Sequence, residues 1–299
     1  MRIFLTGATG FIGAHLVPEL IRSGHQVVGL CRSEAGADQL SRSGAVAFPG
    51  DILDLGRLRA GADGADAVIH TAFNHDFTRL QQHSEDDRQA ILALGDGLAG
   101  SDRPLLVTSG TGLVERTGDD GPVRETDRHA GSARFPRAAT EEAADVLMER
   151  DVDVRVIRLP QVHDAAHFGR IGHHIRLARE RGRVCYVGNG DNRLPAVHVS
   201  DAARLFGLAL ERGARGARYH AVAEEGVPMR AIAEAIGAGL NAPVESIDTT
   251  EAAAYFGPLA GLVALDLAAS GALTRQALGW SPAGPDLLTD LRQGNWTTE

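Results

Sequence analysis

The sequence contains no lysine: all 30 of its lysine or arginine residues are arginine. It contains only two cysteines, Cys31 and Cys185. Its 39 acidic residues bring the net charge to −9. Nucleic-acid binding needs a basic surface that displaces counterions, so this balance argues against nucleic-acid partners. Two cysteines so far apart exclude a disulfide framework and a thiolate zinc site, and they are typical of a reducing compartment. We therefore expect a cytoplasmic protein.

Long hydrophobic runs are also missing. No apolar stretch is long enough to span a bilayer, and the chain enters a strand directly without a signal-peptide pattern, so we expect no membrane association. Aromatic residues make up only 5% of the chain, and alanine and aliphatic residues dominate. That composition is typical of helices packed on a parallel sheet. A chain of 299 residues can form one large domain, alone or with a smaller companion.

Apolar strands alternate with helical patterns through the first half, which predicts a doubly wound parallel α/β sheet of the Rossmann type with a smaller C-terminal substrate lobe. The expected strands are 2–5, 25–30, 45–48, 67–71, 104–108, 154–159, 183–187 and 218–222. The expected helices include 11–23, 86–98, 138–150, 168–181, 202–211 (capped by Ser200 or Asp201), 229–240 and 250–256. We assign 1–160 and about 195–222 to the dinucleotide-binding domain, and 161–194 and 223–299 to the substrate-binding lobe.

A glycine-spaced turn, TGATGFIG, occupies residues 6–13 between the first strand and the first helix. Gly7 permits the tight turn, Gly10 lets the backbone approach a pyrophosphate, and Gly13 lets the helix pack closely on the sheet. The helix N-terminus then offers N–H groups and a positive dipole end to the phosphates. We expect phosphate-side contacts from Gly7, Thr9, Gly10, Phe11, Ile12 and Gly13. The alternative is an ordinary glycine-rich turn.

The residues after the second strand distinguish the two pyridine coenzymes. An acid there accepts a hydrogen bond from the ribose 2′-hydroxyl, whereas an arginine favours a 2′-phosphate. Here Arg32 offers a fork of donors and Ser33 a hydroxyl, so we predict NADP(H) in preference to NAD(H). The charge of Glu34 would oppose a phosphate if it turned inward, and Arg32 could also be a solvated loop residue.

Seven motifs together resemble the short-chain dehydrogenase/reductase superfamily, in its extended, epimerase/dehydratase-like branch. They are TGATGFIG at 6–13, GDI at 50–52, HTAF at 70–73, VTSGT at 107–111, RLPQVH at 158–163, VHVSD at 197–201 and LGWSP at 278–282. The resemblance implies further coenzyme contacts from Asp51, Ile52, Thr71, Ala72, Phe73, Thr108, Pro160 and Val162, with Asp51 accepting from the adenine base. It also implies a homodimer through helices near 86–98 and 138–150.

The superfamily's catalytic Tyr-x-x-x-Lys pair is absent. The register we predict places Arg137 at the tyrosine and Glu141 at the lysine. The family's tyrosine donates a proton and its lysine binds the nicotinamide ribose, but arginine stays protonated and cannot replace the acid. Three interpretations are open: an i,i+4 ion pair, a binding surface without turnover, or Glu141 accepting from the ribose while Arg137 stabilises an oxyanion or a substrate carboxylate. We predict the last.

Without the tyrosine, a proton must come from another group. Ser109 and Thr111 are the hydroxyls at the end of the fifth strand. His163 stands where the resemblance often places a tyrosine, and His75 lies in the loop after the fourth strand. Histidine titrates in the useful range, so both are candidates, although either can be structural.

Three further polar residues are candidate substrate contacts, namely His75, Arg193 and His198. An arginine shortly before the HV-x-D segment clamps a diphosphate in nucleotide-sugar epimerases, but Arg193 lies one residue too early for that pattern. The histidines near 163–174 have no clustered acid or cysteine beside them in the sequence, so we predict no metal site.

These features predict an NADP(H)-dependent oxidoreductase that acts on a carbonyl or alcohol of a small molecule with a non-standard proton donor. One alternative is an NADP(H)-sensing or ligand-binding protein without turnover. The other is a non-redox isomerase, dehydratase or cyclase that keeps the dinucleotide as a scaffold.

Overall fold

The computed structural model describes residues 1–116 and 121–294, and its largest element is a seven-stranded sheet of strand order β10-β6-β5-β4-β1-β2-β3. All six strand pairs in it are parallel. The strands are β1 Arg2–Thr6, β2 Gln26–Cys31, β3 Val46–Pro49, β4 Ala67–His70, β5 Leu105–Gly110, β6 Val154–Leu159 and β10 Arg218–His220. The predicted doubly wound Rossmann sheet is confirmed, with its order reversing between β1 and β4.

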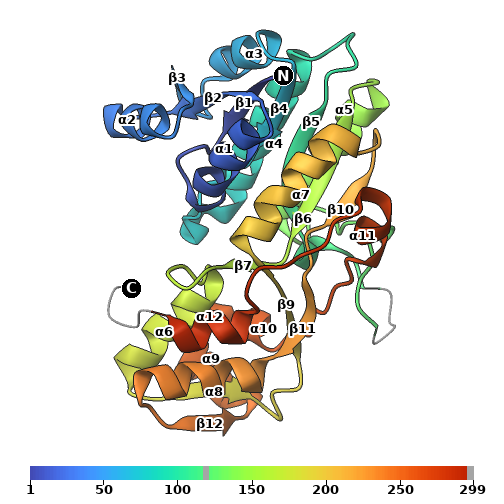
Figure 1. Cartoon of the computed structure of the whole chain (residues 1–299). Helices are drawn as coiled ribbons and strands as arrows, with labels where there is room; N and C mark the ends of the chain where they lie inside the picture. Colours follow the sequence, from blue (N-terminus) through green and yellow to red (C-terminus); the bar gives the residue numbers. More distant parts are fainter. Residues whose placement is uncertain (117–120, 295–299) are drawn as a thin grey trace.

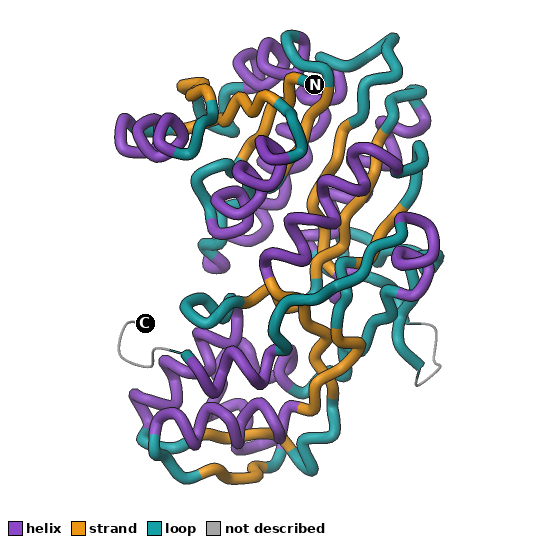
Figure 2. The backbone as a smooth tube through the Cα atoms, in the orientation of Figure 1, coloured by secondary structure: helices purple, strands orange, loops and turns teal. Residues whose placement is uncertain are grey.

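Helices cover both faces of this sheet (Figures 1 and 2). They are α1 Phe11–Arg22, α2 Glu34–Arg42, α3 Leu55–Asp63, α4 Leu80–Asp96, α5 Ala139–Glu149 and α7 Val199–Arg212. Helices α1 and α7 bury their apolar stripes on one face, with Leu16 and Phe206 among the fully buried residues. Helices α3, α4 and α5 bury theirs on the other face, around Leu58 and Leu94. Two-sided burial explains why the strands are almost continuously hydrophobic.

A smaller lobe follows the sixth strand and lies below the sheet in Figure 1. It contains a three-stranded sheet of order β11-β9-β7 and the pair β12-β8. Its strands are β7 Gln161–His163, β8 Val184–Val187, β9 Arg193–His198, β11 Glu224–Pro228 and β12 Val244–Ile247. Its helices are α6 Arg170–Arg181, α8 Met229–Leu240, α9 Thr249–Phe256, α10 Ala260–Val263 and α12 Leu287–Gln293. A core of its own includes Ile175, Ile232 and Leu291.

Two predicted domain limits need correction. Strand β9, in the segment assigned to the larger domain, pairs with β7 and β11 in the lobe. Conversely, α11 (Ala272–Leu278) and Trp280 return to the larger domain and pack in the core beneath α7. The indole of Trp280 donates to the backbone carbonyl of Asp201 at 3.1 Å, which fixes this return. The predicted domain limits did not include this return, because the chain crosses between the larger domain and the lobe more than twice.

Local boundaries also differ from the predictions. Helix α4 begins at Leu80, six residues before the predicted residue 86. Helix α7 is capped by His198, whose ring accepts from the Ser200 amide at 3.2 Å, and not by Ser200 or Asp201. The predicted cap was wrong because the carboxylate of Asp201 is instead buried against the amides of Ala283 and Gly284. That is a contact from 82 residues further along the chain.

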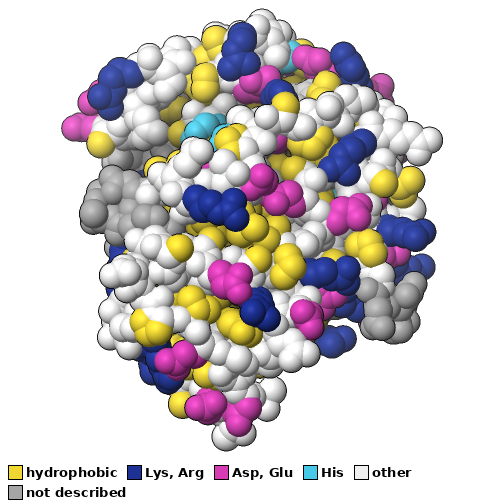
Figure 3. All heavy atoms as spheres, turned by 60° about the horizontal axis from the view of Figure 1, so that its bottom comes forward, with side chains coloured by type: hydrophobic (Ala, Val, Ile, Leu, Met, Phe, Trp, Pro, Cys, Tyr) yellow, Lys and Arg dark blue, Asp and Glu magenta, His cyan; other side chains and the backbone are white. Residues whose placement is uncertain are grey.

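Surface and helix character give two further findings. Within residues 1–116 and 121–294, no helix combines the length and the apolar character that crossing a membrane requires. On the face in Figure 3, arginine and acidic side chains are interspersed among neutral ones.

Candidate active site

The glycine turn lies between β1 and α1, at the point where the strand order reverses. Gly7 has a positive φ of 70°, and a Cβ there would stand 2.7 Å from both the Ala72 nitrogen and the Thr71 hydroxyl. At Gly13 a Cβ would stand 2.1 Å from the Gly7 carbonyl oxygen. The packing of the chain itself therefore requires both glycines.

Gly10 is different, because the only heavy atom within 4 Å of a Cβ there would be the Gly7 oxygen, at 3.3 Å. The protein's own packing does not account for a glycine at this position. Gly10 is exposed and is the N-cap of α1, where no side chain caps the helix. A pyrophosphate fits this arrangement, because it needs close approach to the backbone and the positive end of the helix dipole.

The ends of β2 and β3 bring Arg32 and Asp51 together. The Arg32 side chain is 79% exposed, and its Nε lies 3.9 Å from Oδ2 of Asp51. The Ser33 hydroxyl caps α2 by accepting from the Gly36 amide at 3.2 Å. The carboxyl ends of the parallel strands form one edge of the sheet. At its β2–β3 end this edge carries an accessible cation and an acid side by side, next to the partly buried Ile52.

Hydroxyl side chains tie the ends of the central strands together. Thr71 donates to the Thr6 carbonyl and Thr108 donates to the His70 carbonyl, each at 2.8 Å. Ala72 and Phe73 continue from β4, and Pro160 and Val162 continue from β6. The residues predicted to contact the coenzyme thus follow the carboxyl ends of β1 to β6, and Thr9, Phe11 and Ile12 are all partly exposed.

Arg137 lies at the β4–β5 end of this edge. Its guanidinium stands 3.9 Å from the centre of the Phe73 ring, donates to the Thr108 carbonyl at 3.1 Å and pairs with Asp87 at 2.8 Å. The side chain is 20% exposed. A permanent cation is therefore held, with part of its surface accessible, where β4 and β5 end.

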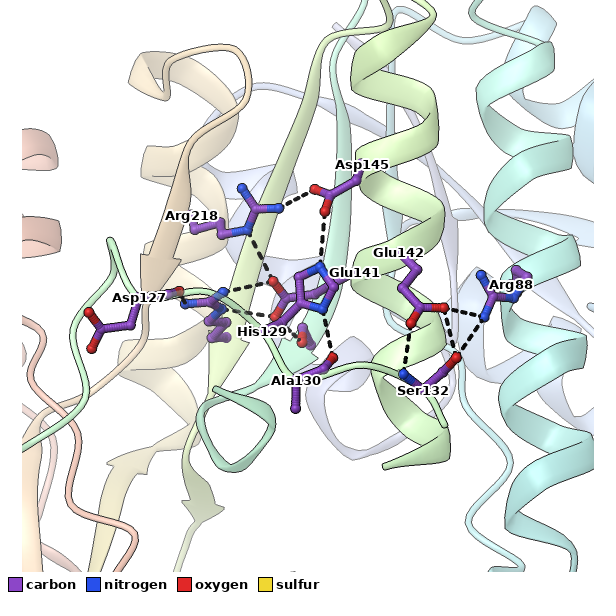
Figure 4. Close-up of polar contacts among 11 residues, drawn as sticks. Arg88, Asp127, His129, Ala130, Ser132, Glu141, Glu142, Asp145 and Arg218 are labelled. Atoms are coloured by element: carbon purple, nitrogen blue, oxygen red, sulfur yellow. Dashed lines mark hydrogen bonds and ion pairs between the residues drawn. The ribbon is translucent and has the colours of Figure 1, made fainter. Parts of the chain in front are cut away.

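Glu141 does not face this position, so the predicted contact between Glu141 and the ribose is wrong. The side chain is fully buried, and Arg158 donates to its two oxygens at 2.9 and 2.8 Å. Arg218 adds a third bond to Glu141 (Figure 4). The Ser109 hydroxyl adds a fourth. Burial would raise the pKa of Glu141, but the bonds and charge of Arg158 outweigh it and lower that pKa. Nor does Glu141 form the i,i+4 pair with Arg137.

The same network changes the predicted role of Ser109. Its hydroxyl donates to Glu141 at 2.7 Å, and its side chain is almost fully buried, so it has no proton to offer a substrate. Thr111 is also buried, at the start of the short 3₁₀ helix η2 (Thr111–Leu113). Neither hydroxyl is presented as an acid.

His163 is a second correction. Its side chain is fully buried in β7, and its Nδ1 lies 2.7 Å from Oδ2 of Asp290 on α12. Burial lowers the pKa of His163 despite that carboxylate. The proposed proton donor thus joins the lobe's strand to its last helix, and its side chain is not accessible to a substrate.

The predicted substrate contacts divide in the structure. At the start of β9, Arg193 donates to Asp266 from its guanidinium, at 3.1 and 2.7 Å, and from its backbone amide, at 2.7 Å. Its neighbour Leu194, which has the spacing expected of a clamp, is buried in the lobe core. His198 caps α7 and packs edge-on against His163. Only His75 adjoins the site around Arg137.

His75 packs edge-on against Phe73, with 5.4 Å between ring centres. Partial burial and the Arg137 cation lower the pKa of His75, so the ring is mainly neutral at pH 7. The His75 loop is anchored by His83, which contacts Asn74 at 3.2 Å and the Asp76 carbonyl at 3.1 Å. Across the described ranges, no group of three or more potential ligands could hold a metal ion.

Sequence reasoning missed Asp87, Arg158 and Arg218 as members of this site. A signal existed for Asp87, because Asp87, Ala90, Ile91 and Leu94 share the i, i+3, i+4, i+7 spacing of a buried helix face. A carboxylate on such a face must be paired. No comparable signal pointed to Arg218, whose partners lie more than 70 residues away.

The parallel sheet, its switch point and the glycine turn define an NAD(P)-binding Rossmann protein. A family model described as NAD(P)H-binding matches residues 7–180, and the chain belongs to this family. Its fold matches solved epimerases and dehydratases, as the resemblance seen in the sequence implied.

Three similar proteins illustrate the range of the family. An uncharacterised protein of Schizosaccharomyces pombe is 42% identical over 293 residues, or 97% of this chain and 98% of that protein. A 2-alkyl-3-oxoalkanoate reductase of Stenotrophomonas maltophilia is 27% identical over 260 residues, covering 81% and 77%. The dTDP-glucose 4,6-dehydratase of Streptomyces venezuelae, solved with NAD bound, has a TM-score of 0.75 at 20% identity, covering 98% and 96%.

Proposed function

We propose that the protein is an NADP(H)-dependent oxidoreductase that reduces a carbonyl, or oxidises an alcohol, of a small molecule held between the sheet edge and the lobe. The observation that carries the proposal is Arg137, a partly exposed cation at the ends of β4 and β5. A 2-alkyl-3-oxoalkanoate reductase among the similar proteins supports this chemistry. The proposal includes a cytoplasmic homodimer.

Arg137 takes the part that the family's lysine plays. A register moved by one helical turn from the predicted one places Arg137 at the lysine position and exposed Ala133 at the tyrosine position. This register agrees with the burial of Glu141, which points away from the edge. In it, Arg137 would bind the nicotinamide ribose, while the acid position would lack a functional group.

His75 is the proton carrier that this arrangement favours. The bound coenzyme supplies or accepts the hydride at the nicotinamide. His75, beside Arg137 and Phe73, would accept the alcohol proton during oxidation and return it during reduction. Because the pKa of His75 is lowered, its neutral form is ready to act as a base at neutral pH, and reduction would be favoured at lower pH.

The test is NADPH oxidation with a panel of small aldehydes and ketones, using the unaltered protein, Arg137→Ala and Arg59→Ala. Arg59 pairs with Asp96 on the surface and serves as the matched control. We expect Arg137→Ala to lower kcat/KM by about 100-fold, as for other lost electrostatic contacts, and Arg59→Ala to leave it unchanged. Equal turnover in Arg137→Ala would contradict the proposal.

A coenzyme-sensing protein is the second candidate, and the alanine at the shifted tyrosine position favours it. Binding of NADP(H) without turnover of any substrate in the panel, together with different affinities for the two oxidation states, would select it. Deuterium retained on labelled NADPH during turnover would instead indicate a non-redox isomerase, dehydratase or cyclase.

A further inference from the structure

Behind Arg137, on the buried side of α4, lies a carboxylate that contacts no solvent. We propose that Asp87 is the counter-ion of Arg137 at the part of the coenzyme site that would hold the nicotinamide. It holds Arg137 against Phe73, and it sets the net charge that a bound nicotinamide ring meets. This inference rests on the proposed function, because it concerns the same coenzyme site. It adds a positioning residue and a consequence for the preferred oxidation state.

Asp87 accepts hydrogen bonds on both of its oxygens. Oδ2 accepts from Arg137 at 2.8 Å and from the Thr140 hydroxyl, and Oδ1 lies 3.0 Å from Nε2 of His70. The Asp87 side chain is 1% exposed. Burial would raise the pKa of Asp87, but the Arg137 charge and the His70 bond outweigh it and lower that pKa. The group is therefore a buried anion at neutral pH.

The hydrogen bonds of His70 continue to the first strand. A carboxylate can only accept, so a neutral His70 carries its proton on Nε2 and donates it to Asp87. Nδ1 then accepts from the Thr6 hydroxyl at 2.7 Å. This chain of bonds joins three buried residues, Thr6 on β1, His70 on β4 and Asp87 on α4, and fixes the Asp87 carboxylate in one orientation.

Arg137 is consequently held from three sides, by Asp87, by the Thr108 carbonyl and by the Phe73 ring. The outer part of the guanidinium is what a ligand at this edge would meet. Without the carboxylate behind it, that part would present an uncompensated positive charge in a partly desolvated place.

The two oxidation states of the coenzyme differ in the charge of their ring. The oxidised nicotinamide is cationic and the reduced one is neutral, so an uncompensated Arg137 would penalise the oxidised form. Asp87 offsets this penalty. Replacing Asp87 by Asn keeps the shape and one acceptor oxygen while it removes the negative charge. The prediction is a selective loss of affinity for NADP⁺ relative to NADPH.

The experiment is calorimetric titration of the full chain with NADP⁺ and with NADPH, comparing the unaltered protein with Asp87→Asn and Asp96→Asn. Asp96 lies on the same helix but pairs with Arg59 at the surface, so it controls for an acid-to-amide change. We expect the ratio of the NADP⁺ Kd to the NADPH Kd to rise about tenfold in Asp87→Asn, and to change by less than about twofold in Asp96→Asn.

A second variant keeps the test valid if Asp87→Asn fails to fold. Arg137→Met leaves Asp87 without its cation, so the same ratio should fall below that of the unaltered protein. The double variant should return it towards the original value, because both charges are gone. Normal binding with an unchanged ratio in both single variants would overturn the inference alone. No affinity for either coenzyme in the unaltered protein would overturn the proposed function together with it.

Discussion

The two ends of the predicted coenzyme site are built by different means. At the α1 end, glycines and backbone groups form the surface, and side chains contribute little beyond Arg32 and Asp51. At the α5 end, the surface is the partly exposed Arg137 guanidinium, and the charges behind it are paired: Asp87 with Arg137 and, deeper, Glu141 with Arg158. One end depends on the absence of side chains and the other on the pairing of charged ones.

This difference shows which part of such a site can change while the fold remains. Gly7 and Gly13 cannot gain a side chain without backbone collisions, so the turn is constrained by packing even before a ligand is considered. The α5 end is constrained only by charge balance. A lysine-free chain can fill it with arginine as long as each cation meets a carboxylate.

The largest expected effect comes from breaking the charge balance at the α5 end. Glu141→Gln should lower the free energy of unfolding by about 3–5 kcal/mol, because Arg158 is fully buried and would lose its anion. Urea unfolding measures this loss. Glu142→Gln, one residue away in a partly exposed pair with Arg88, should cost about 1 kcal/mol or less. If folded Glu141→Gln bound coenzyme much more weakly, the predicted ribose contact would have to be restored.

The next effect sharpens the contrast at the α1 end. Gly10→Ala should lower the melting temperature only slightly, because the new methyl group meets only the Gly7 oxygen, at 3.3 Å, but should weaken coenzyme binding by about 30-fold or more. Gly207→Ala, inside α7 with nothing within 4 Å, is the control: it should leave coenzyme affinity unchanged and raise the melting temperature slightly, because alanine is the better helix former. Undiminished affinity in Gly10→Ala would mean that the pyrophosphate lies elsewhere.

A smaller effect concerns coenzyme choice at the exposed Arg32. Arg32→Ala should weaken NADPH binding by about tenfold and leave NADH binding unchanged, because only NADPH carries the 2′-phosphate. Arg42→Ala, at the other end of α2, should change neither affinity. Titration of both coenzymes measures this, and tighter NADH than NADPH binding in the unaltered protein would refute the assignment.

The smallest effect is a titration shift at His75. Partial burial and the Arg137 cation lower the pKa of His75, so nuclear magnetic resonance should find a pKa below 6.5 in the folded protein. Arg137→Met removes the cation and should raise that pKa, because the protonated ring no longer meets a like charge. An unchanged pKa of His75 in Arg137→Met would show that the Arg137 charge does not act on His75.

Much of the fold could be predicted because hydrophobic period and turn residues are local signals. The strands near 2–5, 67–71 and 154–159 appear within two residues of their predicted limits. The strands β7, β9, β11 and β12 were missed, since strands of three to six residues outside the main sheet carry little pattern. The cap of α7 was wrong because a distant segment competes for Asp201.

The candidate site was predictable where one short segment builds it and unpredictable where several segments meet. The glycine turn is continuous in sequence. The Glu141 cluster joins β5, β6, α5 and β10, and its charges choose partners by proximity in space. A helical spacing of four suggested an Arg137–Glu141 pair, but the two residues have different partners because stronger, more buried ones were available on each side.

By itself, the sequence determined the parallel sheet, the glycine turn between β1 and α1, and the loss of the Tyr-x-x-x-Lys pair, because each is a matter of residue type at fixed short spacing. Only the tertiary structure decided that Arg137 faces the edge, that Glu141 and His163 are enclosed, and that Asp87 stands behind the cation. Buried charges must be neutralised by whatever lies within a few ångströms, and the fold, not the order of residues, sets that distance.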